Sequence, residues 1–139
     1  MDYELAYRYA AASRLDESTG LALATSGGST PEGEAAHPYF FSGFMERPDV
    51  VAAGLLAVAR VARTRFYVPP GMVVAPGGGL TRIGMLDPVV TSTAEGLRFE
   101  SFSVCCGVYA RLDVEASALD ATHRAVGVTN VDVNQPLRA

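Results

Sequence analysis

The sequence contains no lysine, so all 11 of its Lys and Arg positions are arginine. A codon bias of a GC-rich genome explains this most simply, and we give it no chemical meaning. Positive charge is scarce overall, because the net charge is -4 at pH 7 and the pI is about 5.1. Nucleic-acid-binding domains usually carry a basic patch or a pI above about 9. The composition therefore argues against a nucleic-acid partner for this domain.

Long apolar runs are also missing. No window approaches the roughly 18 consecutive apolar residues that a membrane-spanning helix requires. The N-terminus, MDYELAYRYA, carries acidic residues where a secretory signal peptide has a basic start and an unbroken apolar stretch. We therefore expect a cytoplasmic protein with reduced thiols and no membrane contact.

Cysteine is nearly absent: the two cysteines, Cys105 and Cys106, are adjacent. Such a pair does not form a disulfide framework. What is present suits a single domain, since 139 residues with 49% hydrophobic content can build a core. We expect one globular domain over residues 1–139.

The segment Leu97–Val114, LRFESFSVCCGVYARLDV, is typical of a β-hairpin with Val104–Gly107 as its connection. This alignment places apolar or small residues opposite one another on one face, and opposite charges or aromatic rings on the other. The pairs are Leu97 with Val114, Phe99 with Leu112, Ser101 with Ala110, Arg98 with Asp113, Glu100 with Arg111, and Phe102 with Tyr109. Each charged or aromatic cross-strand pair contributes roughly 0.2–1 kcal/mol, and a one-residue slip would turn the apolar face outward. The register is therefore well determined.

One main helix is predicted over Pro48–Phe66. Proline is favoured in the first helical turn, and Asp49 lies where the helix dipole favours negative charge. An apolar stripe follows at spacings of three and four residues. Its members are Val51, Leu55, Val58, Ala62 and Phe66. Arginines 60, 63 and 65 lie near the C-terminal end, where the default interpretation is a solvated helix end rather than a grip on an acidic partner.

The remaining segments complete an α+β fold: an antiparallel sheet of about five or six strands with the helix packed on one face. Strands are predicted at Tyr3–Tyr9, Leu21–Thr25, Pro88–Thr93 and Val126–Val133, where side chains alternate or apolar residues run together. Leu15–Gly20 is predicted as a turn, Ser26–Pro38 as a loop, His37–Met45 as an irregular packed segment and Ser117–Arg124 as a short helix. Leu80–Asp87 is ambiguous.

The last residues, Asn134–Ala139, have a helix-start signature of a capping residue followed by proline. A helix of one turn does not hold itself together. We therefore expect the chain to be the N-terminal part of a longer protein.

Cys105 and Cys106 are the leading candidates for chemistry, because a thiol in a hairpin turn can be exposed and reactive. The register pairs the nearby arginines with carboxylates, which weakens that interpretation, and a packed small residue is the favoured alternative. A metal site would need His37 and His123 brought to the two cysteines, and no metal or cofactor is predicted. His37 is a possible base for a thiol enzyme, although a hydrogen-bonded anchor is favoured, and His123 is expected to be solvated.

Two glycine-rich stretches, at residues 26–30 and 76–79, are interpreted as plain turns. Neither has the G-K-[ST] ending or the following helix of a phosphate-binding loop. No G-x-S-x-G nucleophile motif occurs. The aromatic run Tyr39, Phe40, Phe41 and Phe44 is expected to pack in the core rather than to form a binding patch.

Four segments together resemble a known family: ALATSGGSTPEG (22–33), HPYFFSGF (37–44), RFESFSVCCGVYARLDV (98–114) and TNVDVNQPLR (129–138). In this order they are similar to the N-terminal region of actinobacterial SWIM zinc-finger family proteins. The zinc motif of that family, Cys-x-Cys followed by Cys-x-His, is absent here, so no zinc ligand is carried over to this chain. The resemblance implies a longer protein with nucleic-acid or protein contacts elsewhere in it.

The sequence therefore predicts a non-catalytic domain that serves protein interaction or assembly in a larger cytoplasmic protein. Its partner would be another protein or the remainder of its own chain. The alternative is a small thiol-dependent enzyme or redox sensor that uses Cys105 or Cys106, with His37 as possible base.

Overall fold

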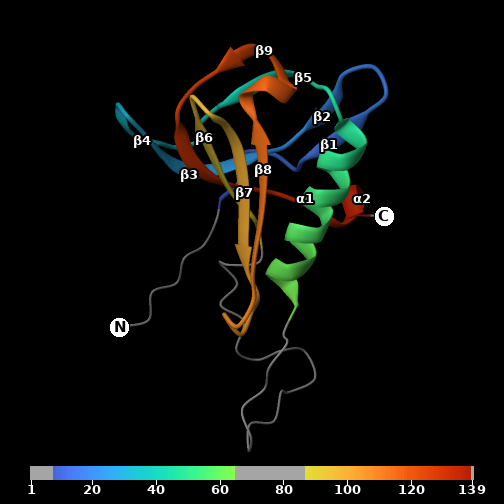
Figure 1. The fold of residues 1–139 in the computed structure, drawn as a ribbon. Helices are drawn as coiled ribbons and strands as arrows, with labels where there is room; N and C mark the ends of the chain where they lie inside the picture. Colours follow the sequence, from blue (N-terminus) through green and yellow to red (C-terminus); the bar gives the residue numbers. More distant parts are fainter. Residues whose placement is uncertain (1–7, 65–86, 139) are drawn as a thin grey trace, which may run out of the picture.

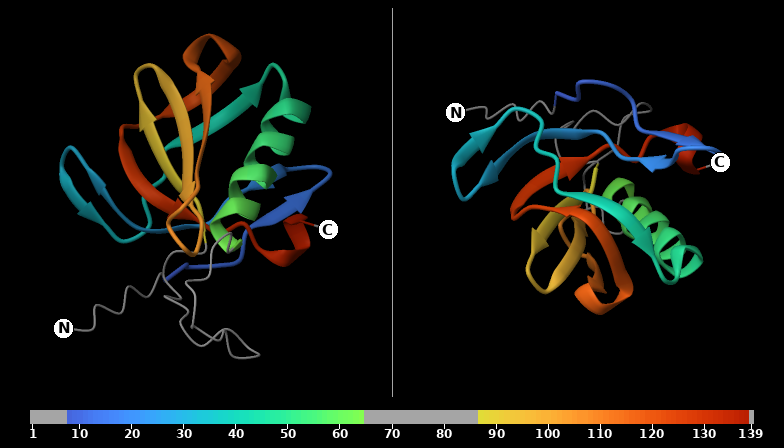
Figure 2. Two further views of the ribbon diagram at one scale, coloured as in Figure 1. Left: turned by 60° about the horizontal axis from the view of Figure 1, so that its bottom comes forward. Right: turned by 90° about the horizontal axis from the view of Figure 1, so that it is seen from above.

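A computed structural model describes residues 8–64 and 87–138 (Figure 1). A six-stranded antiparallel sheet forms the body, with strand order β4-β3-β10-β6-β7-β8. Two further pairs, β1–β2 and β5–β9, form separate two-stranded sheets. The main helix, α1, lies beside β7 and β8 in all views (Figure 2). The α+β prediction is confirmed.

The strands are β1 Arg14–Asp16, β2 Gly20–Ala22, β3 Thr25–Thr30, β4 Gly33–Ala35, β5 Phe41–Met45, β6 Val89–Thr93, β7 Gly96–Phe102, β8 Tyr109–Glu115, β9 Leu119–Arg124 and β10 Gly127–Val131. The helices are α1 Pro48–Arg63 and α2 Gln135–Arg138, and Ala116–Ala118 forms a 3₁₀ turn. No helix in the described ranges is long and apolar enough to cross a membrane.

The β7–β8 hairpin has the predicted register at every pair from Leu97–Val114 to Phe102–Tyr109. The predicted strand at Pro88–Thr93 is β6, which pairs with β7 and completes the meander. On the inner face Leu97, Phe99 and Val114 are buried. Local sequence was sufficient here because each partner lies within a few residues of a turn.

The ion pairs on the outer face of this hairpin differ in one respect from the prediction. Arg98 Nε donates to Asp113 at 2.8 Å, as expected, but Arg111 Nε also binds Asp113, at 2.6 Å, instead of Glu100. Glu100 accepts a hydrogen bond from the Tyr109 hydroxyl. Arg111 and Asp113 are two residues apart on one face of β8, so this contact needs no reach across the sheet.

Helix α1 begins at Pro48 as predicted but ends at Arg63, not Phe66, because Thr64 has extended backbone geometry. Position 66 lies outside the described residues. The buried side is close to the predicted stripe, with Leu55, Val58, Ala59 and Ala62. Ser101 of β7 donates to the Val58 carbonyl at 2.7 Å, which ties helix and sheet together inside the core. The core residues are Phe40, Leu55, Val58, Ala59, Val90, Leu97, Phe99, Val114, Val131 and Val133.

The predicted loop at Ser26–Pro38 is wrong, because this stretch contains the β3–β4 hairpin. Residues 26–30 are therefore strand and not a plain turn. A Cβ at Gly28 would lie 2.2 Å from the Val128 carbonyl oxygen, so the glycine allows close approach of β10. Glycine in a strand can mark such an approach rather than a turn. The glycine run 76–79 lies outside the described residues.

The predicted irregular segment His37–Met45 and the predicted helix at Ser117–Arg124 are also wrong, because they supply β5 and β9, which pair with each other. At Gly43 (φ +156°) a Cβ would lie 2.1 Å from the Asp120 carbonyl oxygen, so only glycine fits this crossing. Only the 3₁₀ turn at Ala116–Ala118 is helical there.

The remaining predictions have mixed outcomes. The strand at Val126–Val133 is confirmed as β10, and the terminal helix is confirmed as α2. The predicted turn at Leu15–Gly20 is confirmed, because residues 17–19 form the turn of the short β1–β2 hairpin. The predicted strand Leu21–Thr25 is divided between β2 and β3. Tyr3–Tyr9 and Leu80–Asp87 lie almost wholly outside the described residues; Arg8 and Tyr9 are not in a strand.

Candidate functional site

The hairpin turn holds both cysteines at the end of β7. Backbone hydrogen bonds join Cys106 N to Ser103 O and Ser103 N to Val108 O, each at 2.8 Å, and Val104 N donates to Thr64 O at 2.9 Å. The turn is therefore attached to the end of α1. Ser103 Oγ also lies 3.4 Å from the Cys105 sulfur.

Neither cysteine is part of the buried core: Cys105 is half-buried and Cys106 is exposed. Cys106 has φ +56°, and it is the only residue other than glycine with a positive φ among those the structure describes. This left-handed geometry costs a residue with a side chain about 1–2 kcal/mol. Glycine would be favoured at this position, because it adopts a positive φ without a steric cost. The chain instead has cysteine at 106 and glycine at the next position, 107.

His37 does not join the cysteines. Its Nδ1 lies 3.1 Å from the Thr25 carbonyl oxygen, and the ring is exposed, which agrees with a hydrogen-bonded anchor. His123 is exposed and stacks on Tyr39 with ring centroids 5.0 Å apart. Across residues 8–64 and 87–138, no group of three or more His, Cys, Asp or Glu side chains is placed to hold a metal.

The aromatic run 39–44 is only partly in the core. Phe40 is buried, but Tyr39 is 63% exposed and Phe44 is 76% exposed, so the core prediction is wrong for these two. Tyr39 borders a shallow groove of about 300 Å³ between the β3–β4 hairpin and the start of β10. The groove is lined mostly by apolar side chains, among them Pro31, Pro38 and Val126, and also by Thr30 and Glu32.

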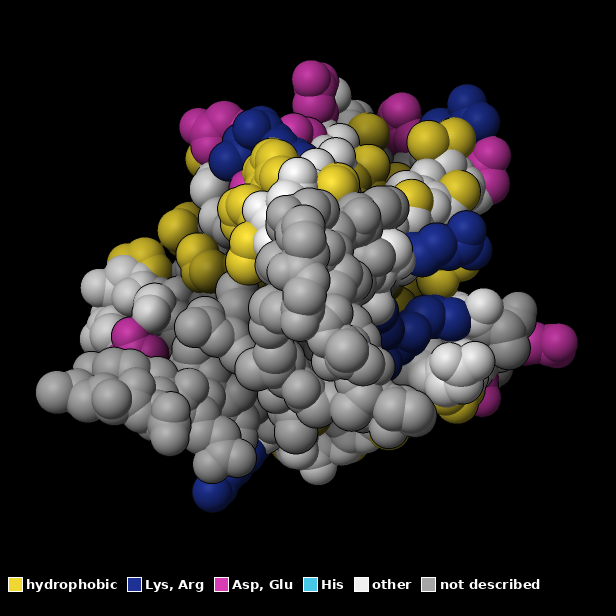
Figure 3. All heavy atoms as spheres, turned by 90° about the horizontal axis from the view of Figure 1, so that it is seen from below, with side chains coloured by type: hydrophobic (Ala, Val, Ile, Leu, Met, Phe, Trp, Pro, Cys, Tyr) yellow, Lys and Arg dark blue, Asp and Glu magenta, His cyan; other side chains and the backbone are white. Residues whose placement is uncertain are grey.

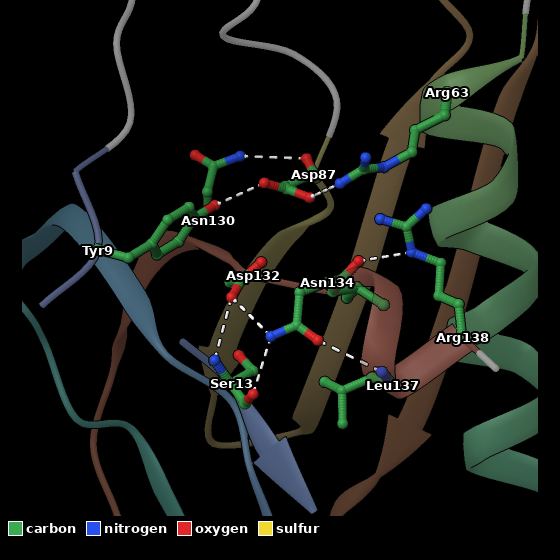
Figure 4. A network of polar contacts seen from close by, with 10 residues as sticks. Tyr9, Ser13, Arg63, Asp87, Asn130, Asp132, Asn134, Leu137 and Arg138 are labelled. Carbon is green, nitrogen blue, oxygen red and sulfur yellow. Dashed lines mark hydrogen bonds and ion pairs between the residues drawn. The ribbon is translucent and has the colours of Figure 1, made fainter. Parts of the chain in front are cut away.

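A polar network fastens the two ends of the described chain (Figure 4). Asp132 accepts from Ser13 N at 3.0 Å, and Asn134 Nδ2 donates to Ser13 O at 2.8 Å. Asn134 Oδ1 also accepts from Leu137 N at 3.3 Å, which confirms its predicted capping role for α2. These contacts span up to 121 residues of sequence, so no local pattern could predict them.

The same region joins α1 to the sheet through Asp87. Its carboxylate accepts from Arg63 at 2.9 Å and from the Tyr9 hydroxyl at 3.1 Å. Arg138 Nε donates to Val133 O at 2.6 Å, and burial, followed by the charge of Arg63, lowers the pKa of Arg138. Figure 3, the view from below, shows arginine side chains at several separate places around this face rather than in one patch. Because its members bind one another, this network is structural.

The outer side of α1 is exposed but apolar, which the sequence analysis did not predict. From position 50 to position 59, every exposed residue of the helix is apolar. These residues are Val50, Ala52, Ala53, Leu56 and Ala57, with Val50 at 49% and Leu56 at 36% exposed. We call these five residues the outer face of α1. Charge appears only at its ends, on Asp49 and Arg60.

Sequence reasoning missed this surface because it assigned only one apolar stripe to the helix. The available signal was VVAAGLLAVA, ten residues without a polar side chain. A surface helix normally has a polar side opposite its apolar stripe.

No protein-family model, no curated protein sequence and no solved structure matches the chain.

Proposed function

We propose that this protein is a non-catalytic interaction or assembly domain of a larger cytoplasmic protein, and that the outer face of α1 is its contact surface. The single observation that carries the proposal is the exposure of an uncharged apolar side of α1 whose inner side is already packed in the core. Exposed apolar patches of this kind mark interaction sites in folded proteins.

The surroundings of the helix support this assignment. The inner side of α1 already packs on β7 and β8 through Leu55, Val58 and Ala59. The outer face is therefore not needed for the core. Three of its five side chains are alanine, which allows a second helix to approach closely.

The resemblance to the N-terminal region of SWIM zinc-finger family proteins agrees with a domain that works within a longer chain. Membership of that family stays a prediction. The acidic net charge favours a protein partner over a nucleic acid.

The test is site-specific photo-crosslinking in the full chain. Benzoylphenylalanine placed at Ala53 should give, on irradiation in cells, an adduct with one defined protein that mass spectrometry can identify. The matched control carries the same group at Glu115, an exposed position on β8. An identical adduct pattern at both positions, or no adduct at Ala53, would contradict the proposal.

A thiol-dependent enzyme or redox sensor stands as a second candidate, favoured by one observation: exposed Cys106 occupies a strained left-handed position. Such outliers often accompany function. Alkylation of the native protein near neutral pH should then label one site rapidly, and Cys106→Ser should abolish this labelling. Labelling only after denaturation would remove the candidate. His37→Ala should leave the rate unchanged, because His37 binds Thr25.

A further inference from the structure

We propose that the partner of the outer face of α1 is a second copy of this chain, bound through an antiparallel pair of α1 helices. This inference rests on the proposed function and names the occupant of the same surface. Charged, small and large residues follow one another along the exposed side of α1 in an order that suits such a pair.

Four residues follow one another along the middle of this side: Asp49, Ala53, Leu56 and Arg60. They are separated by four, three and four residues. At 3.6 residues per turn, these spacings keep all four within one narrow stripe. The buried residues Leu55, Val58 and Ala62 lie on the opposite side of the helix.

The stripe is complementary to itself when it is reversed. A twofold axis between Ala53 and Leu56 places Asp49 opposite Arg60 of the second copy, and Ala53 opposite Leu56. Each large side chain then meets a small one, and each acid meets a base. Self-complementarity about a twofold axis is the requirement for a symmetric dimer.

The charges at the ends of the stripe are available for this contact. Arg47 binds Asp49 at 3.0 Å within one chain, but both side chains are 68% exposed, so the pair contributes little. This hydrogen bond lowers the pKa of Asp49, which keeps the carboxylate ionised. The side chain of Arg60 has no ion pair among the described residues, and it lies exposed in the last turn of α1.

The expected dimer is concentration-dependent. A pair of helices of this length buries less than the roughly 1,200–2,000 Å² of a standard stable interface. Small residues at the crossing allow the helix axes to approach within about 8–10 Å, which lets Leu56 reach the partner's backbone.

Sedimentation velocity on the full chain, from low to high micromolar concentration, tests the inference. The wild type should pass from monomer to dimer. Asp49→Arg and Arg60→Asp should each weaken dimerisation by at least about tenfold, because each places like charges opposite one another twice. Glu115→Arg, a charge reversal on β8, should leave dimerisation unchanged.

The decisive measurement uses an equimolar mixture of the Asp49→Arg and Arg60→Asp variants. In the mixed pair, Arg at position 49 of one chain faces Asp at position 60 of the other, and the remaining contact is also between opposite charges. The mixture should therefore recover dimerisation that neither variant shows alone. Circular dichroism and thermal melting of each variant establish that α1 is still folded.

A wild type that stays monomeric throughout, or a dimer that is insensitive to both reversals and to Leu56→Glu, would overturn the inference. So would two weakened variants whose mixture stays monomeric. A crosslink from Ala53 to a different protein, together with a monomeric wild type, would keep the proposed function and remove only the self-pairing. Absence of both crosslink and dimer would remove both proposals.

Discussion

Two outward-facing surfaces lie on opposite sides of the layer formed by α1 and the β7–β8 hairpin. They differ in the charge that they present to solvent. The outer face of the hairpin is charged, and its groups bind one another: Arg98 and Arg111 share Asp113, while Glu100 accepts from Tyr109. The outer face of α1 carries no charge between Asp49 and Arg60. The charged groups of the hairpin face bind one another, whereas the outer face of α1 is the surface that we propose to bind a partner. The two faces therefore differ in whether their side chains bind within the chain, which exposure alone does not show.

Substitution of two adjacent leucines, Leu55 and Leu56, tests the difference between the inner and outer sides of α1. It has the largest expected effect on the free energy of unfolding. Leu55 is 6% exposed on the inner side of α1, and Leu56 is 36% exposed on its outer face. Leu55→Ala should lower the free energy of unfolding by about 2–5 kcal/mol, because it leaves a cavity in the core. Leu56→Ala should change it by less than about 0.5 kcal/mol. Urea denaturation of the monomeric protein at low concentration measures both, and equal losses would contradict the assignment of two faces.

The second prediction concerns the link between the helix and the hairpin. Ser101→Ala removes the hydrogen bond to Val58 O inside the core. We expect the free energy of unfolding to fall by about 0.5–1.5 kcal/mol. Dimerisation should be unaffected, since Ser101 lies on the inner side. Ser117→Ala, at an exposed position, is the matched control in the same urea titration.

The turn of the β7–β8 hairpin contains one strained residue, Cys106, with φ +56°. Cys106→Gly tests whether this strain lowers the stability of the fold. Glycine adopts φ +56° without a steric penalty, so the folded state is relieved, although glycine also raises the entropy of the unfolded chain. The net stabilisation should reach up to about 1 kcal/mol. The melting temperature measures it, with Cys106→Ala as a control that keeps the strain. A loss of stability would show that the thiol itself holds the turn.

The smallest effect concerns the pH dependence of the charged face. Hydrogen bonds from Arg111 and then Arg98 hold the pKa of Asp113 below its ordinary value of 3.8. The ionised carboxylate is therefore favoured in the folded state, and its contribution is present above pH 3.8 and disappears as the pH falls through the lower folded pKa. Urea midpoints of the wild type and Asp113→Asn should differ at neutral pH and converge in acid. Parallel curves would mean that these ion pairs do not affect stability.

The predictability of the fold depends on how far apart the pairing partners lie. The β7–β8 register followed from the sequence because Arg98 and Asp113 are close to one turn and their charges penalise slippage. The β5–β9 pair did not, because Phe41 meets Arg124 across most of the chain and neither segment has a strong pattern of its own. The sequence predicts a turn at Gly28 because a glycine pattern does not distinguish conformational freedom from the close approach of another strand.

The candidate surface was missed for a related reason. An apolar helix side is assigned to the core unless the number of elements available to cover it is known. The sequence predicts the stripe through Leu55 and Val58, but the residues of the outer face are just as apolar and give no separate signal. Only the arrangement of strands around α1 shows which side is already covered.

The place of β10 has a consequence for biosynthesis. This strand comes last in the chain, yet it lies between β3 and β6 near the middle of the six-stranded sheet. Before β10 emerges from the ribosome, the nascent chain contains β3–β4 and β6–β7–β8, and no strand joins these two parts of the sheet. Because β10 joins them, we expect the six strands to form one sheet only after Val131 has emerged from the ribosome.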